Sequence, residues 1–201
     1  MIESIKEFWY MWLILIVLVA VLLVVMKKAS AAMKKRNSIL AKHREEVERF
    51  KSLVDKYSSA DGTLLLSADA AEVAEGITAV LQYKLEKSTD PDADYNNAPG
   101  WKREVYALYY FSEDCKQSLS YFFKNNGEPL VSVLVSAVKN IGYDKIYPTV
   151  SQMFSMYDEN NESVSLDKTK VAELDEEFSN IFDTDEFFEL VRKYAAENYD
   201  K

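Results

Sequence analysis

Carboxylates are the most abundant chemically active side chains in this chain of 201 residues. There are 33 Asp and Glu against 24 Lys and Arg, which gives a formal net charge of −9. Residues that commonly act as nucleophiles or metal ligands are scarce, since Cys115 is the only cysteine and His43 the only histidine. The sequence therefore has no Cys–His pair, no cysteine zinc cluster and no intrachain disulfide, and it contains no glycine-rich phosphate loop. We expect a protein that is not an enzyme and that binds neither metal nor cofactor.

Glu113 is the carboxylate that leaves an enzymatic alternative open. It stands among Tyr106, Tyr109 and Tyr110 in a strongly aromatic stretch. Partial burial would raise the pKa of Glu113 and suit it to proton transfer, whereas accepting hydrogen bonds from tyrosine hydroxyls would be a purely structural role. The structural role is the more ordinary one, and a carboxylate-only enzyme is kept as an alternative.

Two acidic stretches resemble the start of a calcium loop but lack its later ligands. An EF-hand loop needs glycine at its sixth position and glutamate at its twelfth. After Asp90-x-Asp92-x-Asp94 these positions hold Tyr95 and Trp101, and in the loop that starts at Asp158 they hold Ser163 and Thr169. We therefore predict no calcium site in either stretch.

Acidic residues are concentrated in the C-terminal part of the chain. Residues 61–201 contain 27 Asp and Glu and 13 Lys and Arg. Such a domain repels nucleic acid and anionic lipid but attracts basic proteins. We predict that a partner binds where five carboxylates lie within 12 residues, although Asp183 and Asp185 could simply cap the last helix. The five are Asp175, Glu176, Asp183, Asp185 and Glu186.

Residues 8–26 are expected to determine where in the cell this domain acts. They form a run of nineteen residues with no charge and no helix breaker. As a helix the run is about 28 Å long, which matches the hydrocarbon core of a bilayer. Basic residues follow it, which predicts a single pass through the cell membrane with residues 1–7 outside and the rest cytoplasmic. The basic residues that follow the run are Lys27, Lys28, Lys34, Lys35 and Arg36. A cleaved secretory signal fits less well, although Ala29-Ser30-Ala31 offers a cleavage site, because the apolar run is long and no net positive charge precedes it.

Residues 27–60 are expected to form a basic collar and a stalk helix, with His43 as a solvated stalk residue. Apolar residues recur every seven positions at Met33, Leu40, Val47 and Val54. This pattern favours either pairing with a second copy of the chain or docking of the stalk on its own domain.

Residues 61–201 are expected to form an all-helical bundle. Apolar periodicity and helix-end residues predict helices at 68–87, 101–123, 130–141, 144–157, 170–182 and 184–199. Ser67 would cap the first of these helices, Gly127 and Gly142 would end two others, and Cys115 would be a buried apolar residue of the central helix 101–123. Residues 88–100 and 158–170 are expected to be loops.

Several short motifs follow one another between residue 101 and residue 198. An aromatic helix with a glutamate is followed by an aromatic pair, an asparagine and a glycine, and the residues of this first motif are Glu113, Leu119, Phe122, Phe123, Asn125 and Gly127. Later motifs are Ile141-Gly142-x-x-Lys145, Leu174-Asp175-x-x-Phe178, and Tyr194 with Asn198. In content and order these motifs resemble those of the bacterial DNA-mimic protein family. Gln117-Ser118 replaces the usual Gly-Gly of that family, which puts the turn made there in question.

The resemblance implies an all-helical acidic protein that binds the DNA-binding surface of another protein, with carboxylates placed like phosphates. In this chain that would be a membrane-anchored, non-enzymatic binding module for a basic protein, without direct contact to nucleic acid. The alternative from charge alone is an immunity or inhibitor protein that neutralises a basic toxin.

Overall fold

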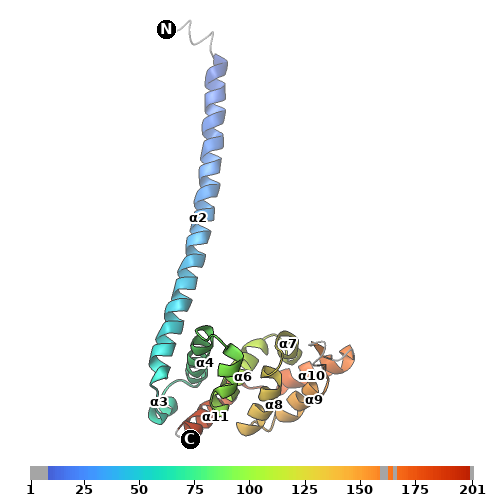
Figure 1. The fold of residues 1–201 in the computed structure, drawn as a ribbon. Helices are drawn as coiled ribbons and strands as arrows, with labels where there is room; N and C mark the ends of the chain where they lie inside the picture. The colour runs from blue at the N-terminus through green and yellow to red at the C-terminus, as the bar shows by residue number, and fades with distance from the viewer. Residues whose placement is uncertain (1–8, 159–162, 165–166, 200–201) are drawn as a thin grey trace. The chain divides into compact units, whose positions relative to one another are not determined.

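The computed structural model describes residues 9–158, 163–164 and 167–199 (Figure 1). The chain divides into two compact units, Met1–Arg49 and Phe50–Lys201. Helices dominate both units, which confirms the all-α prediction.

The first unit is the larger part of one helix, α2 (Trp9–Ser58), which continues into the second unit. Apolar side chains described between Met11 and Met26 are at least half exposed. Among the described residues, no helix is long and apolar enough to cross a membrane. Part of the predicted span at 8–26 lies outside the described residues. Phe8 is among those not described, as are the side chains of Trp9, Tyr10, Leu13, Ala20, Val21, Leu23, Val24 and Val25.

The apolar residues of the seven-residue pattern are exposed along most of α2 and buried near its end. Met33, Leu40 and Val47 are exposed, whereas Val54 and Tyr57, which belong to the second unit, are buried. His43 is exposed, with Glu46 3.8 Å from its Nδ1 atom, in agreement with a solvated stalk residue. The core of the second unit therefore includes residues that precede Asp61.

The second unit contains nine further helices and a short hairpin among its described residues. Strands β1 (Tyr157–Asp158) and β2 (Ser163–Val164) pair antiparallel. The helices are α3 (Gly62–Ser67), α4 (Ala70–Glu86), α5 (Pro91–Asn97), α6 (Gly100–Asp114), α7 (Leu119–Asn125), α8 (Leu130–Asn140), α9 (Tyr147–Ser155), α10 (Lys168–Ile181) and α11 (Thr184–Asn198).

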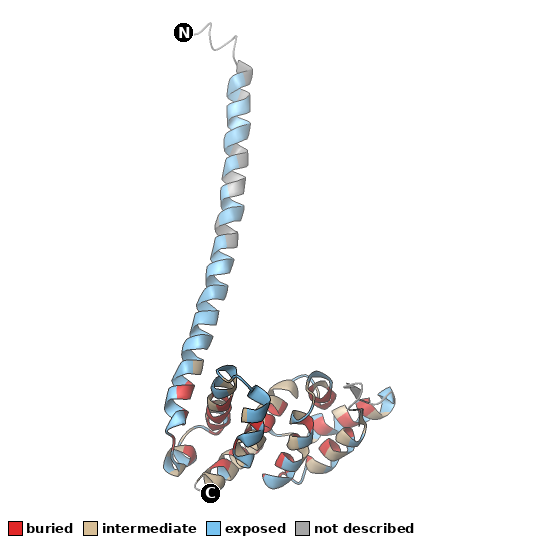
Figure 2. Cartoon of the chain, in the orientation of Figure 1, coloured by how far each residue is buried: buried red, intermediate tan, exposed pale blue. Residues whose placement is uncertain are grey.

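Helix α6 is the central element, as the aromatic stretch predicted. It lies between α4 and α8 and also packs against α7 and α11 (Figure 1). Phe111 is fully buried on α6, and its ring lies 5.5 to 6.1 Å from the rings of four other phenylalanines. These are Phe122, Phe178, Phe182 and Phe187, so the core joins α6 to α7, α10 and α11 (Figure 2).

The single helix predicted at 101–123 is wrong, because the chain turns between α6 and α7. The Ser118 side chain accepts a hydrogen bond from the Tyr121 backbone N–H at 3.1 Å and starts a new helix. Asn126 donates to Asp114 at 2.6 Å, which ties the end of α7 to the end of α6. Cys115 lies in the turn against the core, and burial raises the pKa of its thiol.

Several predicted helix ends also differ from the structure. Asp69, not Ser67, caps α4, because Asp69 accepts from the Glu72 backbone N–H at 3.0 Å. The predicted loop 88–100 contains α5, and helix α9 begins at Tyr147 rather than at residue 144. Gly142 ends α8 with a positive φ of 71°, as expected, whereas α7 ends on Asn126 in extended conformation and not on Gly127.

Candidate functional site

The acidic cluster predicted as a partner site lies on α10 and on the start of α11. Helix α10 buries Val171, Leu174 and Phe178, which follow one another at helical spacing. Its opposite face is exposed and carries Glu173, Glu176 and Glu177. The helix therefore separates a core face from a carboxylate face, and only Glu176 of this face had been singled out from the sequence.

Asp175 is held inside the domain. Its two carboxylate oxygens accept hydrogen bonds from the backbone N–H and the hydroxyl of Ser120, both at 2.7 Å. Ser120 is in the first turn of α7, where backbone N–H groups lack partners within the helix. Asp175 thus acts as a helix cap supplied from α10.

Asp183 and Asp185 stand at the N-terminus of α11, and both are exposed. Asp183 accepts from the backbone N–H groups of Asp185 and Glu186 at 2.9 and 3.0 Å. Its charge also meets the positive end of the helix dipole, as that of Asp185 does in the first turn. The capping role proposed as an alternative is therefore present at Asp183, while the Asp185 side chain makes no capping bond to a described residue.

Glu186 connects the start of α11 to the turn after α8. Lys145 donates to its carboxylate at 2.7 Å, and this hydrogen bond raises the pKa of Lys145. The hydroxyl of Tyr143, a buried residue, lies 3.3 Å from Glu186 and accepts from the Asp183 backbone N–H at 3.0 Å. The motif Ile141-Gly142-x-x-Lys145 thus places a lysine where it fixes the last helix.

The exposed carboxylates of α10 and α11 differ in whether they have a partner within the domain. Glu173 forms an exposed ion pair with Lys170 at 3.1 Å, and Glu177 accepts from Thr149 at 3.2 Å. In the described part of the chain, the side-chain carboxylates of Glu176 and Asp185 have no hydrogen-bond or ion-pair partner. We call Glu173, Glu176, Glu177 and Asp185 the acidic surface.

Glu113 lies at the end of α6 and forms an ion pair with a lysine. Lys116, one turn later, donates to both of its carboxylate oxygens at 2.6 Å. Of the three tyrosines considered beside it, Tyr110 donates to Gln82 at 3.4 Å; Tyr194, on α11, donates to Glu104. Glu113 therefore links the end of α6 to the turn that follows it through an ion pair.

Most of the other residues of the first motif lie in the hydrophobic core. Leu119, Phe122 and Phe123 are fully buried, whereas Asn125 is exposed and Gly127 is half-buried. Within the described residues, no group of three or more histidine, cysteine or acidic side chains is arranged to hold a metal ion.

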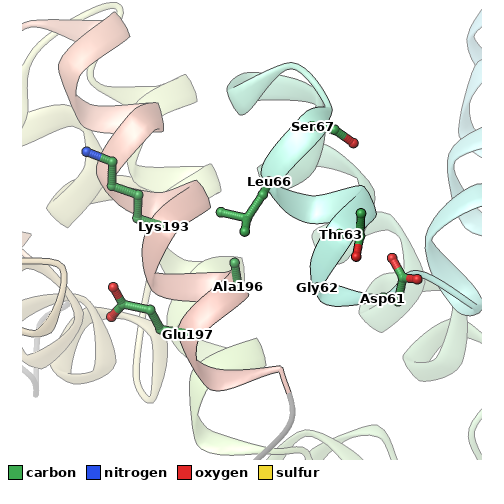
Figure 3. A pocket seen from close by; sticks show the side chains of 8 residues that line it. All are labelled: Asp61, Gly62, Thr63, Leu66, Ser67, Lys193, Ala196 and Glu197. Carbon is green, nitrogen blue, oxygen red and sulfur yellow. The ribbon is translucent and has the colours of Figure 1, made fainter.

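An open groove of about 840 Å³ lies between α3 and α11 (Figure 3). Leu66 and Ala196 face each other across it, with Lys193 and Glu197 on the α11 side. Arg192 joins the two helices by donating to the carbonyl oxygens of Leu66 and Ala68, both at 3.1 Å. The mixed charges of this groove indicate no particular ligand.

Residues 96–198, just over half of the chain, match the family described as DMP19-like protein. The chain belongs to this family. The match begins within α5 and ends at the last residue of α11, so it includes the acidic surface, the turn between α6 and α7, and every motif quoted above. The DMP19-like part excludes α2, α3 and α4. No curated protein and no solved structure matches the chain.

Proposed function

We propose that the chain is a non-enzymatic module that binds a basic protein, with the acidic surface in the place of DNA phosphates. The observation that carries this proposal is the pair of exposed carboxylates, Glu176 and Asp185, which have no partner among the described residues. Membership of the DMP19-like family is consistent with such a role. The partner is a protein that uses the same basic surface to bind DNA.

Electrostatics explains why the acidic surface requires an external partner. Helices α10 and α11 contain eight Asp and Glu but only four Lys and Arg. Glu173, Glu176 and Glu177 repel one another on a single helix face, since residues three and four apart are neighbours there. A cationic partner relieves this repulsion and is attracted over about a Debye length, roughly 8 Å at physiological salt.

We further propose that residues 8–26 anchor the chain in the cell membrane, with the DMP19-like part in the cytoplasm. The uncharged run of nineteen residues and the basic residues that follow it support this orientation. An anchored module would hold its partner at the membrane, away from the bulk of the DNA.

The test is capture of partners by the full chain in mild detergent. Glu176→Gln combined with Asp185→Asn removes two charges without removing a cap. Asp55→Asn combined with Glu197→Gln removes two exposed charges elsewhere and is the matched control. We expect the first variant to associate about fivefold to tenfold more slowly with the captured partner, and the control to behave like the parent.

The identity of the captured protein separates the two candidate functions. A transcription factor or another DNA-binding protein supports DNA mimicry, whereas a toxin supports the immunity alternative. Unchanged association by a well-folded Glu176→Gln, Asp185→Asn variant would contradict the role of the acidic surface in either case.

A further inference from the structure

A second pocket, of about 490 Å³, lies where α5 approaches the loop before α8, and none of the described residues that line it belongs to the acidic surface. Apolar and aromatic side chains form much of its wall, including Leu85, Tyr95, Tyr106 and Leu130. Its charged lining residues are Asp92 and Glu128, both exposed. None of the described residues that line it is basic.

The tyrosine rings of the wall pack against one another, and one of their hydroxyls lacks a hydrogen-bond partner among the described residues. The rings of Tyr95 and Tyr106 pack edge to face at 5.9 Å, and Tyr106 is in turn 4.8 Å from Tyr110. Tyr95 is only 8% exposed, and its buried hydroxyl has no hydrogen-bond partner in the described structure. Leaving a buried hydroxyl without a partner is unfavourable, so a ligand group that reached this hydroxyl and bonded to it would be favoured.

The combination of tyrosine rings and carboxylates selects for a cation. The faces of aromatic rings attract ammonium and guanidinium groups, and nearby carboxylates add charge complementarity. Arg103 acts electrostatically on Tyr95 but does not line the pocket, and an anionic ligand would be repelled by Asp92 and Glu128. A neutral apolar ligand would leave the charges of the two carboxylates without a counterpart, although Glu128 also accepts a hydrogen bond from the Ser132 backbone N–H at 3.3 Å.

We propose that this pocket, which we call the tyrosine pocket, receives an arginine side chain of a partner protein. Arginine fits better than lysine, because its planar guanidinium stacks on aromatic rings and has five donors for the carboxylates and the Tyr95 hydroxyl. This proposal rests on the proposed function, because it assumes that the partner is a basic protein. It adds a point of insertion, separate from the acidic surface, to a module whose acidic surface attracts only by charge.

A small probe tests the pocket without the partner. The tripeptide Gly-Arg-Gly is titrated into the full chain in mild detergent, and binding is followed by saturation-transfer NMR of the peptide. The control peptide, Gly-citrulline-Gly, has the same shape but no charge. We expect the arginine peptide to bind about tenfold more tightly than the citrulline peptide.

Three variants locate the binding. Asp92→Asn combined with Glu128→Gln should weaken Gly-Arg-Gly binding about fivefold to tenfold, while Glu197→Gln, in the other groove, should not. Tyr95→Phe removes the unpartnered hydroxyl and keeps the ring, so it should weaken binding without lowering the melting temperature. Circular dichroism confirms that each variant is folded.

Equal binding of the two peptides, or unchanged binding by the Asp92→Asn, Glu128→Gln variant, would overturn the tyrosine pocket. Neither result bears on capture through Glu176 and Asp185, which is measured separately on the acidic surface. Loss of capture with retained peptide binding would instead remove the proposed function and leave an arginine-binding pocket.

Discussion

At the scale of single residues, the main result is that the acidic cluster contains two kinds of carboxylate. Asp175, Asp183 and Glu186 stabilise the domain through helix caps and a lysine contact, whereas Glu176 and Asp185 have no such role among the described residues. The sequence could suggest a cap at Asp183, because it directly precedes α11. It could not assign Asp175, whose partner Ser120 lies 55 residues earlier in the chain.

The neighbouring pair Asp175 and Glu176 provides a direct test of this division. Replacing Asp175 with Ala leaves the Ser120 backbone N–H and hydroxyl without their acceptor, and should lower the free energy of unfolding by about 1–3 kcal/mol. Replacing Glu176 with Ala should change it by less than about 0.5 kcal/mol. Urea unfolding followed by circular dichroism measures both, and equal effects would argue against a structural role for Asp175.

At the scale of elements, long helices were predictable and short ones were not. Apolar periodicity located most of α4, α6, α8, α10 and α11, because each buries one face over at least eleven residues. Helices α3, α5 and α7 have only six or seven residues, too few to show a period. Each starts instead at a side-chain cap, at Asp61, Asp90 and Ser118 respectively, which is a local signal in an otherwise turn-like sequence.

The packing of α2 on α4 depends on one glycine. A Cβ atom at Gly76 would lie 2.1 Å from the ring of Tyr57, so Gly76→Ala should lower the free energy of unfolding by about 1–3 kcal/mol despite the higher helix propensity of alanine. Gly100→Ala is the control, because a Cβ there meets no atom within 4 Å. Thermal unfolding of the two variants should differ in sign or size, and equal melting temperatures would contradict the close approach.

At the scale of the whole molecule, the second unit begins earlier than the expected domain start at residue 61. Leu53, Val54 and Tyr57 are at most 7% exposed and belong to its core. The sequence could not place this boundary, because the apolar repeat of the stalk runs through it without a break.

A pair of fragments tests the boundary. Residues 50–201 should fold as a helical domain with a cooperative melt, whereas residues 61–201 should be less stable by about 3 kcal/mol or more, since each large buried side chain contributes about 1.5–3 kcal/mol. Differential scanning calorimetry gives both values. The same melting temperature for both fragments would mean that the end of α2 adds nothing to the core.

The proposed membrane orientation makes a separate prediction for the intact chain. A reporter that is active only in the cytoplasm should work when fused after Lys201, and a reporter that requires secretion should not. The charge pattern around residues 8–26 gives this direction. Activity of the secreted reporter would reverse the orientation.

The cap that Asp175 supplies to α7 has a consequence for the order in which the protein matures during synthesis. A ribosome releases the chain from its N-terminus, so the first turn of α7 leaves the exit tunnel 55 residues before the carboxylate that completes it. Until α10 emerges and docks, the Ser120 amide and hydroxyl must bind water or a chaperone. We therefore expect the corner between α6 and α7 to become protected from proteases only after α10 has docked.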